Sequence, residues 1–418
     1  MEYKKLKDLV EINSESITKN YNETIINYLD TSNITNGKIN SVVEMNIGDA
    51  PSRAKRIVRK NDIIYSTVRP NLCHYGILRE TLKNMIVSTG FAVLRCKEGI
   101  LPEYLYEYIT LPSITMRLQA IAETSTSAYP SIKPKDLEDL DILLPPIEIQ
   151  QKIANILSNI DKKIELNSKI NDNLQKLINN LYIKYFINFD EYTGEYKKTE
   201  LGMIPRSFEV DRLGNVITFS NGYGWNSKDM LDEGIEDSYK VFKMGNINIG
   251  GGINKSKTKS WIKKEKVEGL EQYISKKGDI LMCMTDMKNS GNPLLGHTAL
   301  IDRDSEFIIN QRVGIIRCER KLDYTYIYTM SNLKNFIDDI RSRANSGVQV
   351  NLTTKGICDT LILVPDDNTL IKFQQVAKTL YEKIFNNNNE NETLEIMRDS
   401  LLPKLMNGEI DLDKVEVY

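Results

Sequence analysis

The chain of 418 residues carries 55 Lys and Arg residues against 57 Asp and Glu residues, which gives a formal net charge of -2. Its length predicts two or three domains, and a composition of 41% hydrophobic and 27% charged residues is typical of globular proteins. The near-neutral charge excludes a polycation that binds nucleic acid through bulk charge alone.

Membrane, disulfide and metal-binding roles are not expected either. No apolar run approaches the roughly 18 residues of a membrane span, and the opening MEYKKLKDLV lacks the apolar stretch of a signal peptide. The five cysteines are scattered and never in CxxC spacing. This pattern predicts reduced thiols in a cytoplasmic protein, without a zinc site.

Known catalytic motifs are absent from the sequence. With only two histidines, His74 and His297, neither a histidine-based metal site nor a catalytic triad is expected. The phosphate-binding pattern GxxxxGK[ST] and the adenine-methyltransferase pattern [DNS]PP[YFW] do not occur. We therefore expect no catalytic residues in this chain and a role in binding.

In the first half, a basic cluster precedes the first of two predicted strands, residues 62–68 and Phe91–Cys96. A loop rich in hydrogen-bonding side chains follows the first strand, and a second polar segment covers residues 125–133. Cationic side chains suit phosphates, whereas Arg and Asn suit the edges of guanine and adenine. The candidate DNA-binding residues here are Arg53, Lys55, Arg56, Arg59, Arg69, Asn71, His74, Tyr129 and Lys133.

A long helix is predicted over residues 148–190, directly after Pro145 and Pro146. Its apolar residues recur mostly at spacings of three and four, which is typical of a coiled-coil seam. Two asparagines interrupt the seam, either as solvated polar residues or as buried residues that fix the register. The candidate seam comprises Ile153, Ile160, Ile164, Asn167, Asn171, Leu174 and Leu181.

The second half of the chain repeats the first. KNDII at residues 60–64 recurs as KGDIL at 277–281, and IVSTGFAVLRC at 86–96 recurs as IINQRVGIIRC at 308–318. Similar matches in the same order indicate a tandem duplication of about half the chain. The candidate binding residues of this half are Tyr223, Lys255, Lys257, Lys259, Lys288, Asn289 and Gln349.

Three of these lysines, Lys255, Lys257 and Lys259, alternate along the chain and would share one face of a strand. Such a charge run is either an ordinary solvated face or a phosphate-binding face, and its occurrence in both halves keeps the second reading open. The second long helix is predicted within residues 369–418, with Leu380, Ile384, Asn387, Asn391, Leu394 and Leu401 in its seam.

Together these elements predict an α+β protein with two globular domains separated by two long antiparallel coiled-coil helices. The predicted boundaries are 1–147 and 191–368 for the domains, and 148–190 and 369–418 for the helices with the C-terminal tail. The duplication would relate the halves by a pseudo-twofold axis. Such an arrangement suits a partner with two half-sites, of which DNA is the clearest example.

The helix entry LPPIEIQQKIA at residues 144–154, with IDKKIELN at 160–167, resembles the helical region of type I restriction-modification DNA specificity subunits. ELGMIPRSFEV at residues 200–210 is similar to the opening of their second recognition domain. The resemblance covers the whole chain. The second helix departs from the pattern, since Asp366 follows Pro365 and Phe373-Gln374-Gln375 begins the helical run.

The resemblance implies a sequence-specific DNA-binding subunit without catalysis of its own. Each domain would read one half of a bipartite, asymmetric site in double-stranded DNA, while the helices would set the spacer and dock two modification subunits. Those partners, and not this chain, would hold S-adenosylmethionine and methylate adenine after base flipping. Restriction subunits that translocate and cut DNA would complete the complex.

Two alternatives belong to other classes of protein. One is a coiled-coil scaffold whose globular heads bind proteins, and the other is an enzyme such as a methyltransferase with unusual motifs. DNA-binding measurements would separate the first from a specificity subunit, and a methyl-transfer assay of the isolated chain would test the second.

Overall fold

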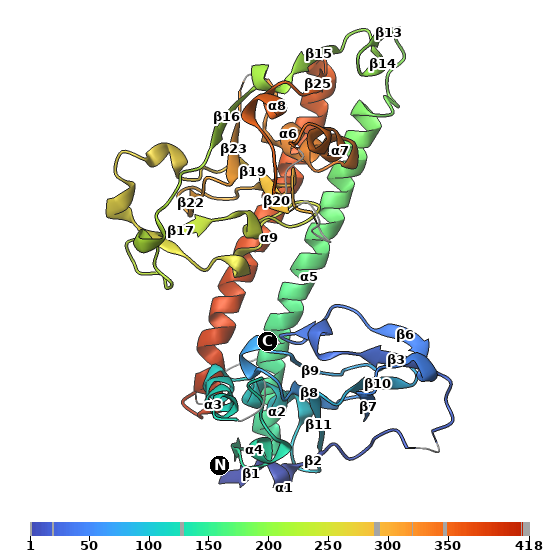
Figure 1. Ribbon diagram of the computed structural model, residues 1–418, viewed down its shortest axis with the longest axis vertical. Coiled ribbons are helices and arrows are strands. Elements are labelled where there is room, and N and C mark those ends of the chain that lie inside the picture. The colour runs from blue at the N-terminus through green and yellow to red at the C-terminus, as the bar shows by residue number, and fades with distance from the viewer. Residues whose placement is uncertain are drawn as a thin grey trace. The chain divides into compact units, whose positions relative to one another are not determined.

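The computed structural model describes residues 2–18, 21–125, 129–287, 293–319, 321–345, 349–410 and 412 (Figure 1). The chain forms two compact units. Unit 1 comprises residues 1–166 and 390–418, and unit 2 comprises residues 167–389. Each unit therefore contains one globular domain together with half of each long helix.

Unit 1 is built on two four-stranded sheets. The first has the order β2 (Val10–Ile12), β11 (Phe91–Cys96), β8 (Ile63–Ser66) and β9 (Tyr75–Ile77), and all its pairs are antiparallel. The second has the order β6 (Val43–Asn46), β3 (Ile25–Leu29), β10 (Met85–Ser88) and β7 (Ala54–Ile57), with β3 and β10 parallel. Strand β11 is buried on both faces: Phe91 and Val93 lie in a core with Leu29, Ile64 and Val87, and Ala92 and Leu94 lie in the main core of the unit.

Short elements complete unit 1. Strand β1 (Glu2–Lys5) pairs with β12 (Asp141–Leu144), and β4 (Ile34–Thr35) pairs with β5 (Lys38–Ile39). The helices are α1 (Leu6–Leu9), α2 (Pro102–Ile109), α3 (Pro112–Glu123) and α4 (Pro134–Glu138), with 3-10 turns η1 (Thr31–Asn33), η2 (Ile47–Asp49) and η3 (Pro70–Leu72).

Unit 2 repeats this plan. Its main sheet has the order β16 (Ile217–Asn221), β23 (Val313–Cys318), β19 (Ile280–Cys283) and β21 (Thr298–Leu300). A second sheet has the order β18 (Trp261–Lys263), β17 (Ser238–Phe242) and β22 (Phe307–Ile309), with β17 and β22 parallel. Strand β15 (Glu209–Arg212) pairs with β25 (Leu361–Val364), as β1 pairs with β12.

The remaining elements of unit 2 include two further strand pairs. These are β13 (Tyr196–Thr199) with β14 (Gly202–Pro205), and β20 (Thr285–Met287) with β24 (Gln349–Asn351). The helices are α6 (Tyr324–Ser331), α7 (Lys334–Ser342) and α8 (Thr354–Cys358). The 3-10 turns are η4 (Leu213–Asn215), η5 (Ser227–Asp229), η6 (Met244–Asn246), η7 (Lys255–Lys257), η8 (Lys264–Val267) and η9 (Glu271–Tyr273).

Equivalent hydrogen bonds confirm the predicted repeat at atomic detail. In unit 1 the buried Tyr104 donates its hydroxyl to the backbone oxygen of Leu143 at 2.7 Å. In unit 2 Tyr326 donates to the backbone oxygen of Leu363 at the same distance. Each bond ties the helix that follows the main sheet to the strand that precedes a long helix, so both domains close in the same way.

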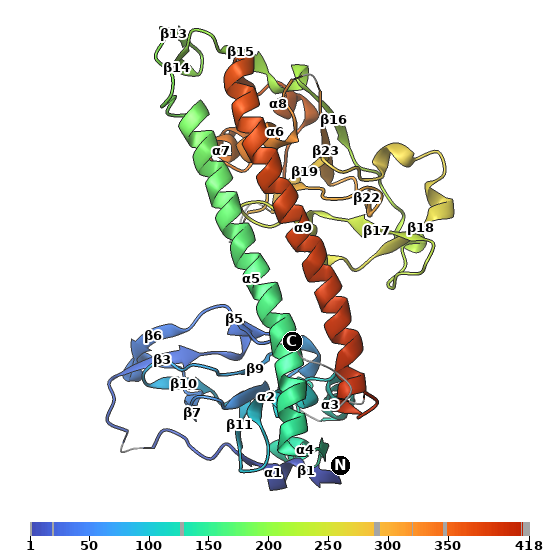
Figure 2. The same cartoon turned by 180° about the vertical axis from the view of Figure 1, so that it is seen from behind.

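The long helices are α5 (Ile147–Phe186) and α9 (Asp367–Met406), each of 40 residues. They run antiparallel within each unit (Figures 1 and 2). In unit 1 Asp161 of α5 pairs with Arg398 of α9 at 3.0 Å. In unit 2 the Asn171 amide donates to Asn388, and the Asn387 amide donates to Asn171, both at 2.8 Å. The predicted mixed fold with an antiparallel helix pair is confirmed.

Each half-helix also belongs to the core of its own unit. Ile153 and Leu157 of α5, with Leu402 and Leu405 of α9, lie in the main core of unit 1. Four aromatic residues do the same in unit 2, namely Tyr182, Phe186, Phe373 and Tyr381. The predicted boundaries treat the helices as separate segments, whereas the structure packs each half of a helix against a domain.

Candidate nucleic-acid interface

In unit 1 the loop after β8 pairs with the segment before α4. We call this region, residues 67–73 and 129–133, the tip of unit 1. Val68, at the end of the β8 segment, forms an antiparallel bridge with Ser131, which precedes α4. The backbone N–H of Ile132 donates to the oxygen of Thr67 at 2.8 Å, and that of Arg69 donates to the oxygen of Pro130 at 2.9 Å. The loop after the strand and residues 129–133, the described end of the second polar segment predicted from the sequence, are therefore neighbours.

Arg69 and Tyr129 lie together on this tip. Both side chains are exposed, and the Arg69 guanidinium carbon lies 5.0 Å from the centroid of the Tyr129 ring. Asn71 is also exposed, and its backbone N–H donates to the Gln119 side chain. The exposed Lys133 donates its backbone N–H to Asp136 at the start of α4.

The His74 side chain contacts strand β4. Its Nδ1 atom lies 2.6 Å from the backbone oxygen of Ile34 and 3.3 Å from the Thr35 hydroxyl. Because a carbonyl oxygen can only accept, the bond to Ile34 assigns the proton to Nδ1. His74 therefore fixes the β8–β9 loop to β4, which leaves Nε2 as its remaining polar atom.

The tip of unit 2 is built on the same frame. The Thr285–Asn351 pair of β20 and β24 stands where unit 1 has the Val68–Ser131 bridge. Gln349 is exposed, and its amide reaches the Thr285 hydroxyl at 3.5 Å. Lys288 and Asn289 lie outside the described residues. Tyr223 packs its ring against Trp225 and Tyr273, at centroid distances of 4.8 and 5.4 Å.

Acidic neighbours neutralise part of the basic cluster of unit 1. Arg53 pairs with Asp30, and Arg59 pairs with Glu15. Arg56 donates to the Ser16 hydroxyl, and burial lowers the pKa of its guanidinium. Lys55 is exposed and has no acidic partner within the described ranges. The sequence showed the cations close together but gave no sign of their distant partners.

The lysines of unit 2 do not share a strand face, which corrects the expectation from their spacing. Lys255 and Lys257 lie in the 3-10 turn η7, where Asn254 and Gly252 precede them and the chain turns too sharply for a strand. Lys255 pairs with the buried Glu306 at 3.0 Å. Lys257 and Lys259 are exposed and form no ion pair with the part of the chain that the structure describes.

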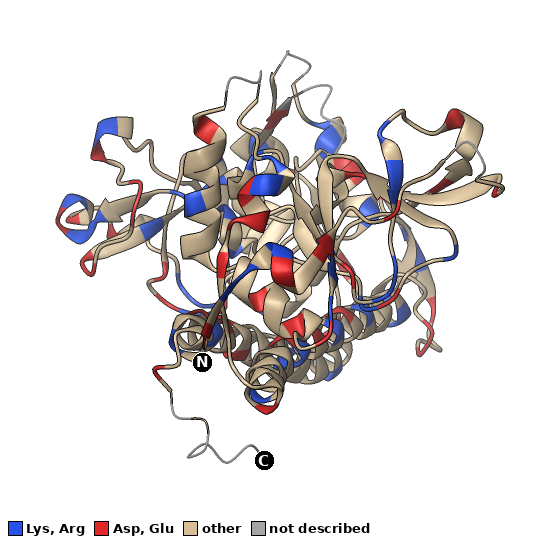
Figure 3. Ribbon diagram, turned by 90° about the horizontal axis from the view of Figure 1, so that it is seen from below, with Lys and Arg blue, Asp and Glu red and all other residues tan. Residues whose placement is uncertain are grey.

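Charges of both signs are interspersed along both units. Figure 3 shows ribbon segments of Lys and Arg interspersed with segments of Asp and Glu along the domains and along the two long helices. The local basic clusters are thus small, and the net charge of -2 reflects mixing rather than an acidic surface.

The predicted seam residues occupy several environments. Ile153, Ile160, Asn167 and Asn387 are buried. The other residues of the set are partly buried, namely Ile164, Asn171, Leu174, Leu181, Leu380, Ile384, Asn391, Leu394 and Leu401. Several fully buried side chains stand one position further along, such as Tyr381 beside Leu380 and Phe385 beside Ile384. These residues face the domain and form a second apolar stripe on the helix. A heptad pattern does not distinguish this stripe from the seam.

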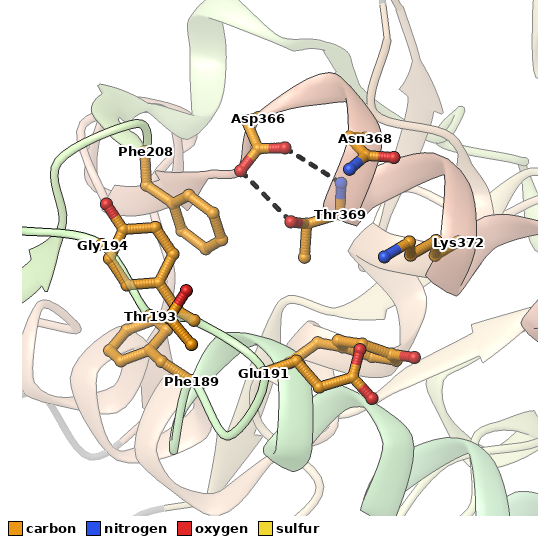
Figure 4. A pocket seen from close by; sticks show the side chains of 11 residues that line it. Phe189, Glu191, Thr193, Gly194, Phe208, Asp366, Asn368, Thr369 and Lys372 are labelled. Atoms are coloured by element: carbon orange, nitrogen blue, oxygen red, sulfur yellow. Dashed lines mark hydrogen bonds between the residues drawn. The ribbon is translucent and has the colours of Figure 1, made fainter.

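A cavity of about 260 Å³ lies in unit 2, between the end of α5 and the start of α9 (Figure 4). Phe189 and Phe208 line its apolar side. Asp366 accepts hydrogen bonds from the Thr369 N–H and hydroxyl and from the Ser207 hydroxyl. Burial opposes ionisation of Asp366, but these donors lower the pKa of its carboxyl group. The carboxylate is thus committed to capping α9.

Among the described residues, no three His, Cys, Asp or Glu side chains gather into a group that could hold a metal ion. Within the same ranges, no helix combines the length and apolar character needed to cross a membrane.

Comparison with solved structures defines the class of fold. The S subunit of a type I restriction-modification system from M. genitalium superposes with a TM-score of 0.56 at 17% identity, over 97% of this chain and 95% of that chain. The fold, with its two domains and paired long helices, is that of such subunits.

Sequence comparisons point to the same group of proteins. Residues 1–176 match the type I restriction modification DNA specificity domain. The HindI specificity subunit of Haemophilus influenzae is 24% identical over 92% of this chain and 94% of its own length. The MjaIX specificity subunit of Methanocaldococcus jannaschii is 26% identical over 86% of this chain and 80% of its own length. The matched domain model and both relatives are specificity components of type I restriction-modification systems, and this chain is similar to those relatives over most of its length.

Proposed function

We propose that units 1 and 2 each read one half of a bipartite, asymmetric site in double-stranded DNA. The proposal rests on one pair of equivalent positions in the two units, which carry side chains of opposite hydrogen-bonding character. Arg69 follows Val68 in unit 1, and Asp286 follows Thr285 at the equivalent place in unit 2. A guanidinium only donates hydrogen bonds and a carboxylate only accepts them, so the two tips suit different base edges.

The second member of each tip differs as well. Tyr129 precedes the paired Ser131 in unit 1, and Gln349 stands at the same distance before the paired Asn351 in unit 2. An aromatic ring offers a stacking face and an apolar edge, whereas an amide offers a donor and an acceptor that match adenine. Different side chains on a repeated frame support two unlike half-sites.

Phosphate contacts would position the units without reading sequence. Lys55, Lys257 and Lys259 are exposed cations without an acidic partner among the described residues. Binding that depends on such cations weakens as salt rises, because counterions are released from the DNA.

The helix pair would set the spacer between the half-sites and dock two modification subunits. Leu177 of α5 and Met397 of α9 occupy equivalent positions in the two repeats, and 46% of each is exposed. Large apolar side chains exposed at the same place in both repeats suit two copies of one partner. In that complex the modification subunits bind S-adenosylmethionine and methylate adenine, and restriction subunits join to cut unmethylated DNA.

The proposal is tested with the complex of this chain and its modification subunits. The complex should bind a duplex with the sequence motif that it methylates far more tightly than a duplex of random sequence. Both affinities should fall as salt rises. Equal affinity for the two duplexes would show that the chain does not read sequence.

The spacer is tested by shortening both helices together. Residues 164–170 of α5 and 389–395 of α9 lie between the Asp161–Arg398 and Asn171–Asn388 pairs, so a double deletion removes matched lengths. Seven helical residues span about 10 Å, or roughly three base pairs, and nearly two full turns. The recognised half-sites should stay the same while the spacer shortens by about three base pairs. An unchanged spacer would contradict the role of the helices.

A further inference from the structure

Arg69 has an unusual backbone conformation for its position. Its φ and ψ angles are 49° and 69°, in the left-handed region, and Pro70 follows it directly. A residue before proline normally adopts an extended conformation, and a side chain with a Cβ disfavours positive φ. Cys73, in the same loop, is also left-handed, with a φ of 53°.

Backbone hydrogen bonds hold the loop in this form. The Arg69 N–H donates to Pro130, the Leu72 N–H donates to the Arg69 oxygen, and the Cys73 N–H donates to Pro70, each at 2.9 Å. The loop is therefore determined from both sides, by its own turn and by the paired segment before α4. Such strain persists where the surrounding structure imposes it, and it is frequent at binding sites.

The Arg69 side chain differs from those of three other arginines of unit 1. Arg53, Arg59 and Arg95 each pair with a carboxylate. Arg69 has no carboxylate partner in the described residues of unit 1, and its guanidinium instead lies over the Tyr129 ring. Contact with the ring restricts the guanidinium, while the exposed side chain keeps N–H groups available for hydrogen bonds.

We propose that Arg69 reads a guanine in the half-site of unit 1 and that Tyr129 is the residue that positions its guanidinium. This inference rests on the proposed function, because it names one base contact of that recognition. A guanidinium edge donates two parallel hydrogen bonds to O6 and N7 of guanine, a pattern that no other base offers in the major groove. Holding the plane in advance reduces the ordering that binding requires.

The test measures the affinity of the assembled complex for duplexes that carry its methylated motif. Each guanine of both half-sites is replaced in turn by 7-deazaguanine, which lacks N7. The wild-type complex should lose between about 5- and 150-fold in affinity at one guanine. Arg69→Lys keeps the charge but lacks the rigid two-pronged edge, so this variant should respond much less than the wild type to 7-deazaguanine at that position.

The controls separate base reading from charge and from folding. Arg69→Lys should bind random DNA as the wild type does and should melt at the same temperature. Tyr129→Phe retains the ring and should keep the response, whereas Tyr129→Ala should weaken it at the same guanine. In the other half-site, Arg69→Lys should respond to every substitution as the wild type does.

Two results would overturn the inference while the proposed function stands. The first is an Arg69→Lys complex that keeps the full wild-type response at every guanine. The second is a uniform loss of affinity on all duplexes, random DNA included, which would make Arg69 a phosphate contact. If the wild-type complex itself binds random and specific duplexes equally, the proposed function fails, and this inference fails with it.

Discussion

Arg95 and Asp62 form a bidentate ion pair in unit 1, and the same pair recurs in unit 2 between Arg317 and Asp279. In the first, Nε and a terminal nitrogen of Arg95 donate to the two Asp62 oxygens at 3.0 and 2.8 Å. In the second, the distances are 2.9 and 3.0 Å. Each aspartate also accepts a backbone N–H from just before it in the chain, that of Arg59 or Lys276. This clamp joins the two central strands of each main sheet.

Loss of the Arg95 guanidinium should destabilise unit 1. Arg95→Met would leave the Asp62 carboxylate, which is almost fully buried, with only its backbone donor. Removing one partner of a buried pair typically costs about 3–5 kcal/mol. Denaturant unfolding of the full chain should show this loss, and adding Asp62→Asn should recover part of it. A single variant as stable as the wild type would contradict the role of the clamp.

The asparagines of the helix pair should behave as a coupled set. Asn171→Leu would remove both bonds to Asn387 and Asn388, and the Asn387 amide is buried. An unpaired buried amide costs about 1–3 kcal/mol, so unfolding should require less denaturant. The double variant with Asn387→Leu should be more stable than the single one, because both polar groups are then replaced. Additive losses would argue against the coupling.

Stability should depend on pH through Glu107 of α2. Burial is the largest cause and the Asp161 carboxylate the second of a rise in the pKa of Glu107 from 4.5 to about 7. Arg398 and Arg79 oppose the shift. A raised carboxyl pKa means that the folded chain binds the proton more tightly than the unfolded chain. The contribution of Glu107 is therefore most favourable below pH 4.5 and is lost as the pH rises toward 7.

Glu107→Gln should remove this dependence. The variant should be more stable than the wild type at pH 8, by up to about 3 kcal/mol, and the difference should shrink toward pH 4.5. Unfolding curves at several pH values measure it, with the exposed Glu98→Gln as a control that should leave the pH dependence unchanged. The equivalent contact of unit 2 is a neutral hydrogen bond of 2.8 Å between Thr329 and Tyr381. A wild-type pH profile in Glu107→Gln would contradict the assignment.

Salt dependence should identify the phosphate contacts. Replacing Lys257 and Lys259 by Ala should lower the slope of log affinity against log salt by about 2, one for each lost contact, on specific and random DNA alike. Lys184, which pairs with Glu191 at 2.7 Å, gives a matched control whose replacement should leave the slope unchanged. An unchanged slope in the double variant would place these lysines away from the DNA.

Local patterns allowed much of the fold to be predicted. The strand expected at residues 62–68 is β8 (Ile63–Ser66), and the helix expected over 148–190 is α5 (Ile147–Phe186). Both predictions rest on periodicity within one segment, which the backbone itself imposes. Because the sequence repeats, each element predicted in the first half is also predicted in the second half. The counterpart of β8, for example, is β19 (Ile280–Cys283).

Contacts between distant segments could not be predicted in this way. Nothing near Arg53 or Lys255 in the sequence shows that Asp30 and Glu306 neutralise them. The apolar positions of α9 serve two surfaces, so Leu380 and Tyr381 could not be assigned to the seam or to the domain from spacing alone. The residues of the ion-pair clamp are easier to find in the sequence, because both aspartates and both arginines lie within the repeated motifs.

In the proposed function, one chain reads two unlike half-sites at a fixed separation. The decisive measurement is methylome sequencing of a host that lacks other methylases and that expresses this chain with its modification subunits. We expect adenine methylation at one bipartite motif, with two different halves and a spacer of fixed length and free sequence. A single continuous motif, two identical halves or methylation without a sequence motif would contradict it.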